Sequence, residues 1–311
     1  MKFGLISSES ILIIALMTGC GGGSLVNTET TSRKNTDSKI EQIQTNAAKI
    51  APFFRPMGRP ARHDWLASHT EPGQSFAEFL DLSPSKPTAE RQTIYAMPLG
   101  TFSAEDRKLI QMTVEFLAAF YDLPVKHMKA RTLKDPALRP RRNRFTNQTQ
   151  FKTGDVIEYI LKPSIPKDAA ALIAFTKEDL YMDQNTNFVF GEASFDSRVG
   201  VWSLSRLDDN TDSQNFLLRT LKIAAHETGH MFSMRHCTKY ECLMSGTNHL
   251  AETDRRPVDT CPECTAKISW LSDVSFDDRY RRLIEFCKKT GLTEIEKEFA
   301  AKLKAVEAGK L

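Results

Sequence analysis

Three histidines and one glutamate have the spacing of a zinc-binding catalytic helix. Residues 226–236 read HETGHMFSMRH, which is HExxH followed by a third histidine six residues later. On a helix of 3.6 residues per turn, His226 and His230 share one face and can bind one ion, while Glu227 can reach a water on that ion. His236 lies too far along to share that face, so the chain must leave the helix and turn back. Three histidines would leave one position open for water, as hydrolytic zinc sites do.

A mixed sheet and several helices are expected to position this motif. Ser103 can cap a helix that reaches Tyr121, Thr153 can cap a shorter one, and the helix bearing HExxH is expected to start at residue 212 or 213. Four apolar runs are typical of strands, and the last two are expected to pair antiparallel: residues 93–99, 170–175, 187–190 and 199–204. The predicted fold class is α/β (α+β), a mixed twisted sheet packed with helices and followed by a smaller, mostly helical C-terminal part.

Gly229 stands inside the predicted HExxH helix. Glycine in a helix interior costs about 1 kcal/mol relative to alanine. Close packing, or a need for space near the metal, is therefore expected at this position.

The composition is that of an ordinary globular protein. The chain has 311 residues, of which 41% are hydrophobic and 26% charged, so extensive disorder is not expected. A formal net charge of +3 is too small to indicate a nucleic-acid partner. The basic run at residues 139–144 could bind an anion, but a solvated loop is the preferred interpretation.

The first 90 residues divide into three segments. Residues 1–20 resemble a bacterial lipoprotein signal peptide, with Lys2, a short apolar run and Gly19-Cys20, although Met17 stands where leucine is usual. Lipidation of Cys20 would anchor the protein extracytoplasmically in the cell envelope, and a simple leader or other anchor is the alternative. Residues 21–50 are expected to be a flexible tether, and residues 51–90 an extension packed on a catalytic domain at 91–311.

Four of the six cysteines follow the histidine motif closely. Cys237 comes directly after the third histidine, Cys242 five residues later, and Cys261 and Cys264 form a CxxC pair. With Met244 two residues after the second of these cysteines, the pattern resembles the archaemetzincins, a family of metzincin-type zinc metallopeptidases. Further similar segments bring the resemblance to roughly residues 60–290: Asp64-Trp-Leu, residues 95–100, Asp179-Leu-Tyr, residues 187–192 and residues 203–207.

The resemblance implies two zinc ions per chain. One would be catalytic, with Glu227 as general base and Met244 beneath its three histidine ligands, His226, His230 and His236. The other would be structural, held by Cys237, Cys242, Cys261 and Cys264. Four thiolates can close a tetrahedron with no open position, but in an oxidising compartment the same cysteines could instead form disulfides. Cys287 is expected to be a buried free thiol.

Ser233 departs from the usual metzincin pattern, which has glycine where the helix turns toward the third histidine. If that turn requires a left-handed backbone, serine costs about 1–2 kcal/mol. His236 is therefore the ligand whose placement depends most on the tertiary structure.

The predicted function is zinc-dependent hydrolysis of peptide bonds. The resemblance suggests an aminopeptidase-like preference for short peptides, and a monomer is expected. The main alternative is a surface-tethered zinc protein with a vestigial metal site, although nothing structural requires the carboxylate of Glu227. A CxxC thiol oxidoreductase is disfavoured because no thioredoxin-like βαβ pattern surrounds Cys261.

Overall fold

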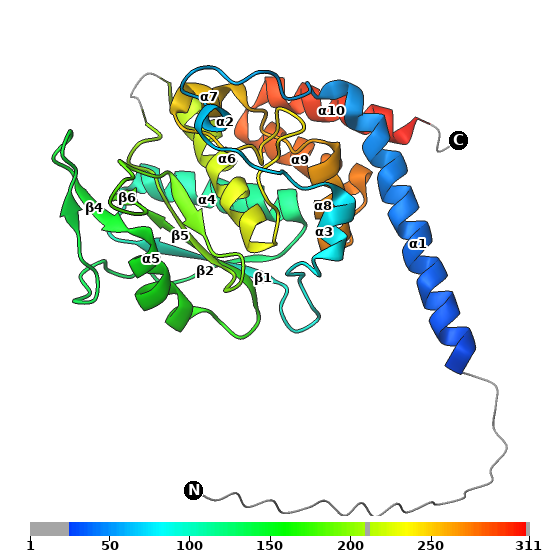
Figure 1. Cartoon of the computed structure of the whole chain (residues 1–311), viewed down its shortest axis with the longest axis horizontal. Helices are drawn as coiled ribbons and strands as arrows, with labels where there is room; N and C mark the ends of the chain where they lie inside the picture. Colours follow the sequence, from blue (N-terminus) through cyan, green and yellow to red (C-terminus); the bar gives the residue numbers. More distant parts are fainter. Residues whose placement is uncertain (1–24, 209–211, 309–311) are drawn as a thin grey trace, which may run out of the picture. The chain divides into compact units, whose positions relative to one another are not determined.

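A five-stranded sheet supports the helix that contains the HExxH motif (Figure 1). The computed structural model describes residues 25–208 and 212–308. The strands of this sheet are β1 Thr93–Leu99, β2 Val125–His127, β5 Ala169–Thr176, β7 Gly191–Ala193 and β8 Val199–Ser203. They stand in the order β2-β1-β5-β8-β7, and all pairs are parallel except β7 with β8. The mixed sheet expected from the sequence is confirmed.

A smaller sheet stands beside the first. Its order is β3-β4-β6, with strands β3 Arg141–Arg142, β4 Thr149–Lys152 and β6 Asp179–Tyr181. Part of the basic run at 139–144 is thus a strand and not a free loop. The guanidinium of Arg141 donates to the carbonyl of Thr186 at 2.6 Å and lies over the ring of Tyr181.

Helices cover both faces of the central sheet (Figure 1). Every residue of β5 and β8 is buried, as expected for parallel strands with both faces covered. One face packs against α4 (Ala104–Tyr121) and α6 (Ser213–Met231), and the other against α5 (Thr153–Val156) and the π-helical segment η2 that follows it (Ile157–Leu161). The apolar stretches of the sequence therefore form the core that holds α6 in place.

The helix starts predicted at Ser103 and Asp212 are confirmed. Ser103 and Asp106 form a capping box at the start of α4, and the carboxylate of Asp212 accepts a hydrogen bond from the backbone N–H of Gln214 at the start of α6.

The C-terminal part is helical, with α7 Leu250–Arg255, α8 Pro262–Ser272, α9 Phe276–Thr290 and α10 Thr293–Glu307. Shorter helical segments are η1 Ala51–Phe53, α2 Trp65–Ser68, α3 Phe76–Asp81 and η3 Lys162–Ser164.

The expected flexible tether at residues 21–50 is wrong for most of its length, because Leu25–Ile50 form the helix α1. This stretch contains neither glycine nor proline. Ile43, Ala47 and Ile50 recur at helical spacing and are buried within the compact unit of residues 41–311. The leader and Cys20 lie outside the described residues. No helix in the part of the chain that the structure describes is long and apolar enough to cross a membrane.

Two other element bounds differ from expectation. The strand predicted at residues 187–190 is a loop, and the edge strand β7 follows it at Gly191–Ala193. The side-chain amide of Gln150 donates to the carbonyl of Asn187 at 2.8 Å, a contact between residues far apart in sequence that holds the loop. Thr153 is the first residue of α5 and not its cap, since its hydroxyl donates to the carbonyl of Tyr181.

Candidate metal centre and catalytic cleft

The helix α6 presents His226 and His230 side by side, as their spacing predicts. Their Nε2 atoms are 3.0 Å apart. His236, which follows the helix, joins them, and the ligand atoms of the three histidines all lie within 4.8 Å of one another. The structure thus brings together the three histidines predicted to bind the catalytic zinc.

The chain reaches His236 through a left-handed turn at Ser233, where φ is 65°. The backbone N–H groups of Phe232 and Met234 both donate to the carbonyl of Gly229, which closes the turn directly after α6. Two contacts offset the strain of a non-glycine residue: the Ser233 hydroxyl accepts from the N–H of Ser85 at 3.0 Å, and its carbonyl accepts from the amide of Gln74 at 3.1 Å. Both partners come from the N-terminal extension.

A hydrogen bond at Nδ1 orients the imidazole of His226, and another orients that of His230. Nδ1 of His226 lies 3.0 Å from the carbonyl of Leu243, and Nδ1 of His230 lies 2.7 Å from that of Met234. A carbonyl only accepts, so each Nδ1 carries the proton and leaves the Nε2 lone pair free for a ligand. Burial lowers the pKa of His230 to about 4 and that of His226 well below its usual value, which keeps both rings neutral. Neutral, oriented imidazoles fit a metal ion.

His236 has a carboxylate as its partner. Its Nδ1 lies 2.9 and 3.0 Å from the two carboxylate oxygens of Glu71. Burial alone would raise the pKa of Glu71, but the hydrogen bond with His236, the charge of His236 and weaker contributions from Trp65 and His69 together outweigh it, and the pKa is lowered. Glu71 is a residue of the site that the sequence analysis did not identify.

Glu227 is buried beside the histidines, in the same cleft. Burial, with a contribution from the nearby carboxylate of Glu192, raises the pKa of Glu227 to about 8. Gly191 lets β7 approach, because a Cβ at that position would lie 2.9 Å from Cγ of Glu227. An edge strand therefore passes directly beside the carboxylate predicted to act as the base.

Met244 packs against Gly229 of α6. A Cβ on Gly229 would come within 2.6 Å of the sulfur of Met244 and 3.2 Å of the hydroxyl oxygen of Tyr121. The Tyr121 hydroxyl also donates to the carbonyl of Ala225 at 2.6 Å, which supports the helix just before its first histidine. Close packing is thus the reason for the glycine in α6.

We expect Gly229→Ala to lower the free energy of unfolding by about 1–3 kcal/mol, although alanine has the higher helix propensity. The clash with Met244 accounts for the loss. Urea unfolding at equilibrium measures it, with Gly154→Ala as the control, because a Cβ on Gly154 meets nothing within 4 Å. A Gly229→Ala variant as stable as the parent would contradict this packing argument.

Four cysteine thiols form a second cluster next to the first. The sulfur atoms of Cys237, Cys242, Cys261 and Cys264 lie within 4.8 Å of one another, and all four residues are buried. They are free thiols, with 3.6 Å between the sulfurs of Cys237 and Cys261. Hydrogen bonds from the other thiols lower the pKa of Cys237, while burial raises that of Cys242 and Cys261. Four converging sulfurs without a disulfide match the donor set that closed structural zinc sites use, so this cluster could hold a metal ion.

The predicted free thiol at Cys287 is also buried, in α9 and outside the cysteine cluster. Burial raises the pKa of its thiol to about 12. It has no part in the metal centre.

The histidines and Glu227 open into a cleft of about 240 Å³. The loop before β7 and the turn after it contribute aromatic side chains to one wall, and Trp65 from the N-terminal extension contributes to the wall near His236. The further aromatic residues of the lining are Phe188, Phe190 and Phe195. The cleft is thus largely apolar around a polar centre, as is usual for sites that bind small molecules or peptides.

Comparison with known proteins agrees with this geometry. Residues 164–270, which contain both clusters, match the profile of peptidase family M54. Mouse archaemetzincin-2 is 32% identical over 300 residues, an alignment that covers 83% of each chain. This chain belongs to the archaemetzincin family. It is therefore a zinc metallopeptidase, and its substrates are peptides or proteins.

Other archaemetzincins align with large parts of this chain. Human archaemetzincin-2 is 30% identical over 270 residues, covering 75% of this chain and 74% of that protein. The crystal structure of archaemetzincin from Methanopyrus kandleri aligns with a TM-score of 0.50 and 25% identity, covering 60% of this chain and 99% of that one. The archaemetzincin fold expected from the sequence is confirmed.

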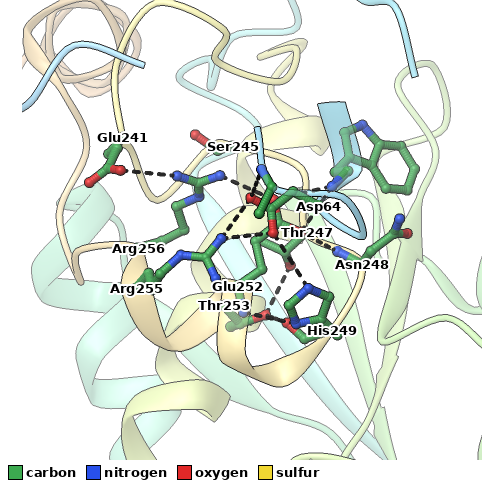
Figure 2. A network of polar contacts seen from close by, with 12 residues as sticks. Asp64, Glu241, Ser245, Thr247, Asn248, His249, Glu252, Thr253, Arg255 and Arg256 are labelled. Carbon is green, nitrogen blue, oxygen red and sulfur yellow. Dashed lines mark hydrogen bonds and ion pairs between the residues drawn. The ribbon is translucent and has the colours of Figure 1, made fainter. Parts of the chain in front are cut away.

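A network of polar contacts joins the N-terminal extension of this archaemetzincin to α7, beside the metal centre (Figure 2). The carboxylate of Asp64 accepts from the guanidinium of Arg255 at 2.8 Å and from the N–H of Ala61 at 2.9 Å. The carboxylate of Glu252 accepts from the N–H of Trp65 at 3.0 Å and from Arg256 at 3.1 Å. Asp64, His249 and Glu252 lie close enough to hold a metal, but arginines already occupy both carboxylates. The cluster therefore fixes the position of the extension.

Trp65 could have been noticed only through the resemblance of Asp64-Trp-Leu to the archaemetzincins, and no sequence pattern indicated Glu71. Neither has a spacing that connects it to the histidines, from which both are separated by more than 150 residues of sequence. The tertiary contact alone makes them part of the site.

Proposed function

We propose that this archaemetzincin cleaves peptide bonds at the cleft of α6, with a catalytic zinc held by His226, His230 and His236 and with Glu227 as the general base. The observation that carries the proposal is the convergence of the three imidazoles beside the buried carboxylate of Glu227. A vestigial metal site would not require that carboxylate, so catalysis is favoured over a purely binding role.

A zinc ion held by these imidazoles would supply Lewis-acid chemistry, which makes a water molecule in the cleft easier to deprotonate. Glu227 takes the proton as the water attacks the scissile carbonyl, and returns it to the leaving amine. A pKa near neutrality suits a group that must first accept and then release a proton. Because burial raises the pKa of Glu227 to about 8, the positive charge of a bound zinc ion would favour the ionised carboxylate that the first step requires.

The edge strand β7 is the proposed guide for the substrate. Among the described residues it pairs with β8 alone, at the edge of the sheet, and its Gly191 lies directly against Glu227. An extended peptide that adds to the free edge of β7 would bring its backbone past the base. Short peptides with a free amino end, as in aminopeptidase action, are the substrates to try first, and the aromatic lining of the cleft offers contacts for apolar side chains.

We also propose a structural zinc at Cys237, Cys242, Cys261 and Cys264. Cys237 directly follows His236, and its N–H donates to the carbonyl of Met244 at 2.8 Å. A zinc that fixes this cluster would therefore also fix the third histidine and the methionine beneath the site. Membrane attachment through Cys20, an extracytoplasmic location and a monomeric state are further parts of the proposal that rest on the sequence.

Metal stoichiometry tests both sites. We expect two zinc ions per chain in the purified protein, falling to one in His226→Ala and to one in Cys261→Ala, as measured by elemental analysis. Peptidase activity is expected to disappear in His226→Ala. A parent protein with a single zinc, or a cysteine cluster with disulfides in place of free thiols by thiol titration, would refute the two-zinc assignment.

A further inference from the structure

His236 differs from the other two histidines in how its side chain is held. His226 and His230 lie on α6, whose backbone hydrogen bonds fix their positions, and their Nδ1 atoms face backbone carbonyls. His236 lies beyond the helix in a loop without regular structure, after the left-handed residue Ser233. The orientation of its ring therefore depends on side-chain contacts.

The carboxylate of Glu71 supplies that contact. Both of its oxygens lie within 3.0 Å of Nδ1 of His236, and its side chain is only 24% exposed. An ionised carboxylate only accepts hydrogen bonds, so Nδ1 of His236 must donate, and Nε2 remains free to face the other two histidines. The ring of Trp65 meets the His236 ring edge-on, with 5.3 Å between centroids, and limits rotation from another side.

The segment that carries Glu71 is fixed on both sides of it. On the N-terminal side, the network of Figure 2 attaches Asp64 to Arg255 and the backbone of Trp65 to Glu252. On the C-terminal side, the amide of Gln74 accepts from the N–H of Arg235 at 3.1 Å and donates to the carbonyl of Ser233. Glu71 is therefore held against the loop that delivers the third ligand.

We propose that Glu71 is a positioning residue of the catalytic metal centre, which holds His236 as an Nε2 ligand and makes the N-terminal extension part of that centre. The inference rests on the proposed zinc-binding role of the three histidines. Residues 51–90, for which the sequence indicated no chemistry, would thus supply an outer carboxylate of the kind that orients metal-binding histidines. This segment precedes the family profile, whose match begins at residue 164.

Zinc affinity tests the proposal in the full chain, with Glu71→Ala, Glu71→Gln and Glu78→Gln as variants. Glu78 lies on the same segment, but its carboxylate contacts Ser75 and not a histidine. Each protein is equilibrated at a series of chelator-buffered free zinc concentrations and its zinc content is measured, so that the cysteine site serves as an internal reference. The metal-free melting temperatures are recorded in parallel.

We expect Glu71→Ala to raise the apparent dissociation constant of the histidine site by about 10- to 100-fold while the cysteine site is unchanged. Glu71→Gln keeps an acceptor oxygen and should recover much of this loss, and Glu78→Gln should match the parent. Parent-like affinity in Glu71→Ala would overturn the proposal. So would equal losses at both zinc sites with a lowered melting temperature, because Glu71 would then be structural. A parent that binds no zinc at the histidines would instead refute the proposed function itself.

Discussion

Glu227→Gln is expected to lower kcat for a peptide substrate by about 10²- to 10⁴-fold, the usual contribution of a general base. The amide has the size of the carboxylate but cannot take the proton from the attacking water. Zinc content should stay at the parent value, because the proposed ligands are the three histidines and not Glu227. The measurement combines steady-state kinetics with elemental analysis of the same samples.

Glu227→Gln is not expected to be less stable than the parent, so unfolding would not explain its lower kcat. Burial disfavours the ionised form of Glu227, as its raised pKa shows, so a neutral amide removes an unfavourable charge. The melting temperature of Glu227→Gln should therefore equal or exceed that of the parent. Glu178→Gln, at an exposed position outside the cleft, is the control. Parent-like turnover in Glu227→Gln would eliminate Glu227 as the base.

Asp259→Asn is expected to lower the free energy of unfolding by about 3–5 kcal/mol, because it leaves buried cations without their counter-ion. The carboxylate accepts from Arg279 at 3.0 Å and from Lys302 at 3.0 Å, and all three side chains are almost fully buried. These contacts attach α9 and α10 to the loop that leads into Cys261. Guanidinium unfolding would measure the loss, with the exposed residue Asp81→Asn as control.

The pKa of Asp259 predicts that the stability of the fold depends on pH. Burial alone would raise the pKa of Asp259, but the charges of Lys302 and Arg279 outweigh it and the pKa lies below its usual value of 3.8. A carboxyl group with a lowered pKa stabilises the fold above its unfolded pKa, and this stabilisation is lost as the pH falls toward the folded pKa. The stability difference between the parent and Asp259→Asn should therefore be constant above about pH 5 and narrow below pH 3.8. A difference that narrows near neutral pH would contradict this assignment.

Local sequence patterns predicted the elements that depend mainly on local interactions. Ser103 and Asp212 cap α4 and α6 through contacts with residues two or three positions away, so their starts were readable. The strand predicted at residues 187–190 was wrong, because contacts with distant segments decide the conformation there. The loop at residues 187–190 is held by Gln150, and β7 is placed after it, where Gly191 can approach Glu227.

By itself, the sequence determined which groups can bind metal and which carboxylate can act as the base. The spacing of His226, Glu227 and His230 is a property of one helix, and the helix geometry carries it unchanged into the fold. The four cysteines that follow the histidines were likewise recognised from their positions in the sequence.

Only the tertiary structure decided how the third histidine is held. His236 follows a strained turn at Ser233, and the groups that offset this strain and orient the ring, Gln74, Ser85 and Glu71, come from a segment about 150 residues earlier. Such contacts depend on the packing of distant parts of the chain and produce no periodic pattern in the sequence. The proposed metal ligands could therefore be predicted from one stretch of sequence, whereas the contacts that orient His236 could not.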